Sequence, residues 1–157
     1  MSQHHIKRFF ACILIVLFIF SSSIPFQSVN ATTSSITPRA SNYLDSYNSY
    51  IYPAALGKIQ VWFSVTGDNY MDEIGVLTIK IYESTDASNW TWVETFNHNT
   101  TSGMLTYDDI YYTGHVDYQG TIGRYYKAYV CIWAGKDRDG DTRYMRTQPK
   151  KATLLPG

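Results

Sequence analysis

Apolar residues recur with a period of two along most of this 157-residue chain, and this alternation constrains the fold more than any other feature. The clearest example is "RYYKAYVCIWA", residues 124–134. One set of alternate positions holds Tyr126, Ala128, Val130 and Ile132, and the other holds Tyr125, Lys127, Tyr129, Cys131 and Trp133. Because successive side chains of a β-strand point to opposite faces, this pattern predicts a strand that buries one face.

Other strands are predicted where alternating or aromatic runs lie between clusters of turn-forming residues. In order, the predicted strands cover residues 42–52, 58–67, 76–84, 90–96, 111–120, 124–134 and 142–148. Seven strands with short turns and no convincing helix predict an all-β domain. The leading architecture is an antiparallel sandwich of immunoglobulin-like or fibronectin-type-III-like form, and a small closed barrel is the alternative.

Local features of the predicted strands add detail to this architecture. We expect one hairpin between residues 76–84 and 90–96, and Leu77 should share the core face with Ile79 and Ile81. In sandwiches of this kind, a tyrosine near the start of the sixth strand bonds back to the preceding corner. Tyr126, just after "GTIG", is the candidate for this role.

The start of the chain predicts a cleaved secretory signal. Lys7 and Arg8 precede an unbroken apolar run over residues 9–20, which is shorter than the roughly 20 residues of a bilayer span. Val29 and Ala31 supply the small-residue pattern that signal peptidase reads. An uncleaved membrane anchor is the alternative. The predicted organisation is a signal over 1–31, a flexible leader over 32–42, a β-domain over 43–148 and a tail over 149–157.

Cleavage after Ala31 would give a secreted domain without a membrane span. It would leave 11 lysines and arginines against 13 acidic residues, a net charge of 11 − 13 = −2. This balance does not supply the basic surface that nucleic-acid binding requires. Cys131 would then be the single cysteine, so no disulfide forms within the domain. No cofactor is expected.

Several short segments together resemble a family of short secreted proteins of Gram-positive bacteria that has no assigned function. These segments are "VTGDNYMDEIG" (65–75), "IKIYES" (79–84), "SGML" (102–105) and "GTIGRYYKAYVCIWAGK" (120–136). The resemblance spans roughly residues 41–147. It implies an exported bacterial β-domain and assigns no catalytic residues.

An acidic loop, "AGKDRDGDTRYM" (134–145), is a candidate metal site. Its aspartates fit positions one, three and five of an EF-hand calcium loop, and they are Asp137, Asp139 and Asp141. The diagnostic glycine and glutamate positions hold Thr142 and Gln148 instead. A looser metal site remains open. The alternative is a charged turn between the last two strands, in which Gly140 adopts a positive φ.

Aromatic residues on the less aliphatic strand faces are the second candidate site. Trp62, Tyr129 and Trp133 occupy such positions, and flat rings on a sheet face can stack against sugar rings. Aromatic ladders across neighbouring strands stabilise sheets without any ligand, so a purely structural role is the alternative.

Motifs for catalysis are missing from the sequence. There is no Gly-x-Ser-x-Gly nucleophile turn, and His98 and His115 lack the close spacing of zinc ligands. The sequence therefore predicts a secreted, non-enzymatic module that acts by surface interaction, with an unknown protein or glycan at the cell surface as its partner. The alternative is a carbohydrate-binding module that uses exposed aromatic residues on one sheet face.

Overall fold

A computed structural model of the chain describes residues 41–156, which contain seven strands and one short 3-10 turn. The strands are β1 (Leu44–Pro53), β2 (Lys58–Ser84), β3 (Thr91–Asn97), β4 (Leu105–Gln119), β5 (Tyr125–Lys136), β6 (Asp139–Arg146) and β7 (Lys150–Lys151), and the turn is Ala55–Gly57. All strand pairs are antiparallel, which confirms the predicted all-β class. The predicted signal and most of the leader lie outside the described residues.

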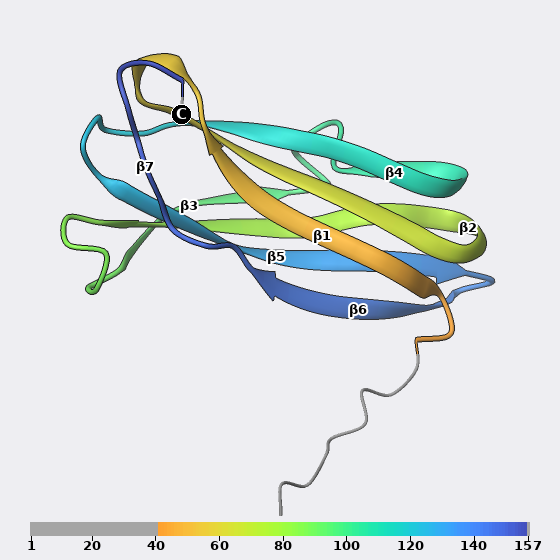
Figure 1. The fold of residues 1–157 in the computed structure, drawn as a ribbon. Helices are drawn as coiled ribbons and strands as arrows, with labels where there is room; N and C mark the ends of the chain where they lie inside the picture. The colour runs from red at the N-terminus through yellow and green to blue at the C-terminus, as the bar shows by residue number, and fades with distance from the viewer. Residues whose placement is uncertain (1–40, 157) are drawn as a thin grey trace, which may run out of the picture. The chain divides into compact units, whose positions relative to one another are not determined.

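The 27-residue strand β2 runs through the whole sheet. Its first part, up to Gly67, pairs with β1 and with most of β4, and its second part pairs with β3 and β5. Figure 1 shows β2 bending back at one end of the domain, so that both parts belong to one curled sheet. The sequence predicts two separate strands, 58–67 and 76–84, where the structure has the single strand β2. The immunoglobulin-like arrangement of the strands stays a prediction.

The connection predicted between those two strands is itself mostly extended. "TGDNYMDEIG" is rich in turn-forming residues, but Met71 and Ile74 within it are buried in the core. Burying these two side chains favours the extended backbone over a free loop. A register shift against β4 between Thr66 and Met71 accommodates the bend.

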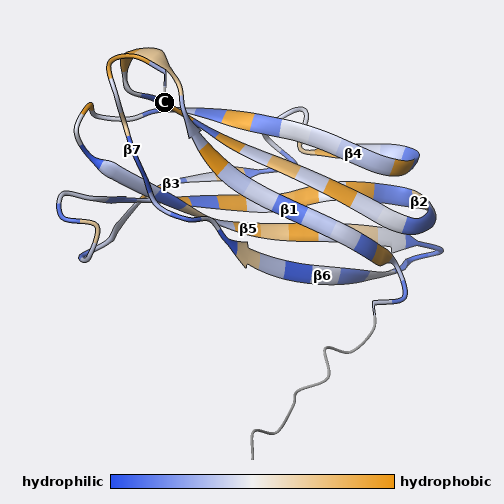
Figure 2. Cartoon of the chain, in the orientation of Figure 1, coloured by the Kyte–Doolittle hydropathy of each residue, from blue (hydrophilic) through white to orange (hydrophobic). Residues whose placement is uncertain are grey.

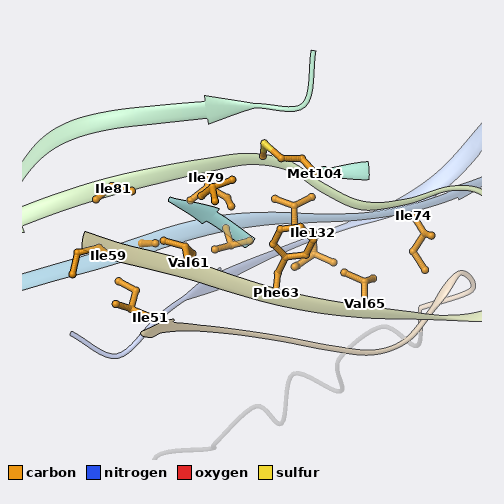
Figure 3. Close-up of a cluster of buried hydrophobic side chains, with 14 of the residues drawn as sticks. Ile51, Ile59, Val61, Phe63, Val65, Ile74, Ile79, Ile81, Met104 and Ile132 are labelled. Atoms are coloured by element: carbon orange, nitrogen blue, oxygen red, sulfur yellow. The ribbon is translucent and has the colours of Figure 1, made fainter. Parts of the chain in front are cut away.

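The core lies between the two parts of β2. Figure 3 shows isoleucines and valines from β1, both parts of β2, and β5 in one buried cluster that also contains Phe63 and Met104. The hydropathy colours alternate along these strands in Figure 2, as the period of two predicts. Within residues 41–156, no helix has the length and apolarity needed to cross a membrane.

One core position differs from the prediction. The register against β5 shifts between Val76 and Thr78, so Val76 is fully buried and Leu77 is only partly buried. The prediction that Leu77 faces the core with Ile79 and Ile81 is therefore wrong. A bulge inserts one residue and reverses the alternation on one side of it.

Tyr126 makes the corner contact that the sequence predicts. Its ring is fully buried, and its hydroxyl accepts a hydrogen bond from the Thr121 N–H at 2.8 Å. The hydroxyl also donates a hydrogen bond to the Glu83 carboxylate, which is held by Arg124 at 3.2 Å. Burial and the Glu83 contact raise the pKa of Tyr126 to about 12. The corner therefore links the start of β5 to the end of β2.

The end of the chain packs onto the domain. β7 pairs with Tyr125 and Tyr126, and Ala152 is buried. The N–H groups of Leu56 and Gly57 donate to the carbonyls of Leu154 and Thr153 at 2.9 and 2.8 Å. This part of the predicted tail lacks any hydrophobic alternation, so its pairing is not visible in the sequence.

We expect Tyr126→Phe to lower the free energy of unfolding by about 1–3 kcal/mol, because the Thr121 N–H loses its acceptor and Glu83 loses a donor. Urea denaturation would measure this loss. Tyr70→Phe is the matched control, since Tyr70 is 63% exposed, and it should change stability little. Equal stability of wild type and Tyr126→Phe would show that the corner contact contributes nothing.

Candidate functional site

The candidate site is the outward surface of β5, which we call the β5 face. It comprises the outward side chains of β5 from Lys127 to Trp133, together with residues paired with them on β2 and β6. On β5 these are Lys127, Tyr129, Cys131 and Trp133, and the paired residues are Thr78, Lys80 and Tyr82 on β2 and Thr142, Tyr144 and Arg146 on β6. Long-range pairing therefore assembles a surface rich in aromatic and cationic groups.

An open hollow of about 550 Å³ occupies the middle of the β5 face. It is lined by Leu77, Thr78, Lys80, Tyr82, Tyr129, Cys131 and Tyr144. Tyr82 and Tyr129 meet edge to face, with ring centres 5.3 Å apart, and Tyr144 is 80% exposed. Aromatic rings thus border the hollow on all three strands, and hydroxyl and ammonium groups lie beside them.

Trp133 extends the β5 face toward the β5–β6 hairpin. A Cβ on Gly140 would lie 2.4 Å from the Trp133 ring, and a Cβ on Gly135 would lie 2.5 Å from it. These two glycines are paired across β5 and β6, so the indole packs directly on the backbone of both strands. We call this glycine pair the seat of the indole. The indole N–H is enclosed and has no hydrogen-bond partner within the described part of the chain.

A second hollow, of about 270 Å³, lies beside the seated indole. Its lining combines Trp133 with charged side chains of β2 and the hairpin, namely Asp72, Glu73, Lys136, Arg138 and Asp139, and with Gly135. It follows the Tyr129 hollow along the same strand. The β5 face therefore presents two hollows, each with an aromatic ring and polar neighbours.

The β5–β6 hairpin turns on two residues with positive φ, Asp137 at 53° and Arg138 at 69°. Lys136 and Asp139 pair on either side of them, which is the geometry of a type I′ turn. The prediction that Gly140 adopts a positive φ is wrong. Glycine is needed at position 140 because a Cβ there would lie 2.4 Å from the Trp133 ring and 2.7 Å from the Ala134 carbonyl oxygen.

The three aspartates of this loop bind other parts of the protein. Asp141 accepts hydrogen bonds from Ser41 Oγ at 2.5 Å and from the Asn42 N–H at 2.8 Å, and these contacts lower its pKa. Asp139 accepts a bond from the Tyr43 hydroxyl at 3.1 Å. The Asp137 N–H donates to Asp72 at 2.8 Å.

Metal binding by these aspartates gains no geometric support. Among residues 41–156, no group of three or more His, Cys, Asp or Glu side chains is arranged to hold a metal ion. Asp139 and Asp141 instead fasten residues 41–43 to β6, so two residues of the predicted leader contact the domain.

Trp62 lies on a different surface. It sits in an aromatic ladder across β1, β2 and β4, with Tyr50 at 6.4 Å and 6° on one side and His115 at 4.4 Å and 26° on the other. Gln60 accepts a bond from its indole N–H at 3.3 Å. Because His115 stacks closely on the ring, much of the Trp62 face is already covered. The structure thus brings Tyr129 and Trp133 together and leaves Trp62 apart from them.

Cys131 lies between Tyr129 and Trp133 but is largely buried and forms no disulfide with another described residue. Burial raises the pKa of its thiol, so the neutral form dominates at neutral pH.

The sequence prediction of the site did not include Lys80, Tyr144 and Arg146. Their place beside Tyr129 depends on strand register, which alternation alone does not reveal.

Comparison with known proteins adds one distant structural similarity. No protein-family model matches the chain, and no curated protein sequence matches it. A family 76 glycoside hydrolase from a bovine Bacteroides thetaiotaomicron strain is similar at 15% identity and a TM-score of 0.30. The match covers 68% of this chain and 20% of that enzyme. A similarity at this score carries no argument about fold or activity.

We expect Gly135→Ala to lower the free energy of unfolding by about 1–3 kcal/mol, because its Cβ, 2.5 Å from the Trp133 ring, forces the indole from its position. Urea denaturation followed by near-ultraviolet circular dichroism would measure the loss and the movement of the ring. The control is the same substitution in a Trp133→Ala background, where its cost should be much smaller. An equal cost in both backgrounds would show that the added Cβ does not compete with the Trp133 ring for space.

Proposed function

We propose that this chain is a non-enzymatic module that holds an extended carbohydrate chain along the β5 face, outside the cell. The observation that carries the proposal is the pair of hollows that follow one another along β5, with Trp133 at one and Tyr129 at the other. Sugar rings have an apolar face that packs on aromatic rings and hydroxyls that hydrogen-bond to polar neighbours. Both kinds of group are present at each hollow.

The length of the β5 face suits a polymer better than a single sugar. Side chains two residues apart on a strand are about 6.6 Å apart, so the row from Trp133 to Lys127 extends for about 20 Å. Within this row Tyr129 is exposed and Lys127 and Trp133 are half-buried, and Tyr82 and Tyr144 border it on the neighbouring strands. An extended chain of several sugar units fits along such a row.

The surface of β1, β2 and β4 that carries the Tyr50–Trp62–His115 ladder, which we call the ladder face, is a weaker candidate for the same role. Its hollow, beside Tyr50 and Trp62, measures about 250 Å³ and is bordered by Tyr52 and Gln60. The rings there stack on one another across strands, which stabilises the sheet and uses ring surface that a sugar would need. We therefore place the ligand on the β5 face.

Binding to an array of neutral and acidic oligosaccharides, followed by calorimetric titration of the strongest ligands, tests this proposal. Tyr129→Ala and Tyr144→Ala should each weaken binding about tenfold, as expected when a central aromatic contact is lost. Both side chains are exposed, so neither change should unfold the domain. The bound oligosaccharide should be recovered uncleaved.

The matched control is Tyr50→Ala, which removes an exposed tyrosine of the ladder face and should leave binding unchanged. Weaker binding by Tyr50→Ala with unchanged binding by Tyr129→Ala would move the site to the ladder face and overturn the proposal. Failure to bind any oligosaccharide would overturn it as well.

A further inference from the structure

Three cationic side chains gather around Tyr129 at the middle of the β5 face. Lys80 on β2 and Arg146 on β6 are paired directly with Tyr129 across the two neighbouring strands. Lys127 lies two residues away on β5, and its Nζ is 5.8 Å from the centre of the Tyr129 ring. Lys80 lines the Tyr129 hollow. Lys127 and Arg146 lie on the same face as Lys80, because directly paired residues share a face, as do residues two apart on one strand.

None of these three cations has an acidic partner within residues 41–156. The ion pairs of those residues are Lys58–Asp117, His115–Asp117, Arg124–Glu83 and Arg143–Asp141. Glu83 is engaged by Tyr126 and Arg124, and the Glu94 carboxylate accepts a bond from the Thr95 N–H at 2.8 Å. The glutamates beside the Tyr129 end of the β5 face are therefore engaged elsewhere, whereas Asp72, Glu73 and Asp139 line the Trp133 hollow at the other end together with Lys136 and Arg138.

Lys127 is held in place by aromatic rings. Its Nζ lies 4.2 Å from the centre of the Trp90 ring and 6.0 Å from that of Tyr82. Cation–π contacts fix the position of an ammonium group without neutralising its charge. A fixed positive charge thus lies beside the exposed Lys80 and Arg146.

We infer that the β5 face binds a polysaccharide that carries negative charge, as carboxylate, sulfate or phosphate groups. The inference rests on the proposed function and specifies its ligand. The domain that remains after signal cleavage would have a net charge of −2, so a cluster of three unpaired cations runs against the overall charge of the molecule. On the ladder face, by contrast, Asp117 lies 3.2 Å from Lys58 and 3.7 Å from His115. The charge at the Tyr129 end of the β5 face therefore complements an anionic ligand.

Two matched pairs of polymers test the inference by calorimetric titration at low salt. Polygalacturonate is compared with its methyl ester, and dextran sulfate with dextran, so that each pair keeps the sugar ring and changes the charge. In at least one pair, the charged member should bind about tenfold or more tightly than the neutral member, and its affinity should fall as salt rises. Lys80→Gln and Arg146→Gln should each weaken binding of that charged polymer three- to tenfold, on the order of a rim charge contact, and should change the affinity for its neutral counterpart by a smaller factor.

Lys58→Gln is the control, since Lys58 is an exposed lysine of the ladder face and should not affect binding. Equal affinity for the charged and neutral members of both pairs would overturn the inference and leave carbohydrate binding standing. Failure of all four polymers and of the oligosaccharide array would overturn the proposed function itself. Tighter binding of a single-stranded oligonucleotide than of either charged polysaccharide would overturn the inference in favour of a nucleic-acid ligand.

Discussion

The continuity of β2 is the constraint on which the rest of the structure depends. This single strand pairs with β1, β3, β4 and β5, so four strands take their register from it. Its bend turns the apolar faces of its two parts toward one core, where Phe63 and Ile79 are both fully enclosed. Burial of these alternate side chains is the main favourable term that holds the curled sheet closed.

The same alternation determines what the outside of the sheet can do. Since aliphatic residues take the inward positions, tyrosine, tryptophan, lysine and arginine are left on the outward positions of β2, β5 and β6. The two outer surfaces then use their aromatic rings differently. Trp62 stacks with its cross-strand neighbours, whereas Trp133 rests on a glycine pair beside an open hollow. That difference is the physical basis for proposing that recognition occurs at the β5 face.

Local patterns in the sequence predict strands in the regions of β1 to β6 and the buried corner of Tyr126, because alternation and turn chemistry act over a few residues, but they do not predict β7. The merging of residues 58–84 into one strand was not predictable, since turn-forming residues between Thr66 and Gly75 are overridden by core burial. Strand register is also non-local. It placed Lys80 and Arg146 on either side of Tyr129, and it exchanged Leu77 for Val76 in the core. Sequence reasoning found the aromatic half of the candidate site and missed its cationic half.

The central claim is that ligands bind on the outward surface of β5 and its two neighbouring strands. Chemical-shift mapping of backbone amides by nuclear magnetic resonance, during titration with the tightest-binding polysaccharide, tests it most directly. We expect the largest shifts in β5, in β6 and in the second part of β2, centred on Tyr129. Shifts concentrated on β1, β4 and the first part of β2, around Trp62, would contradict the account.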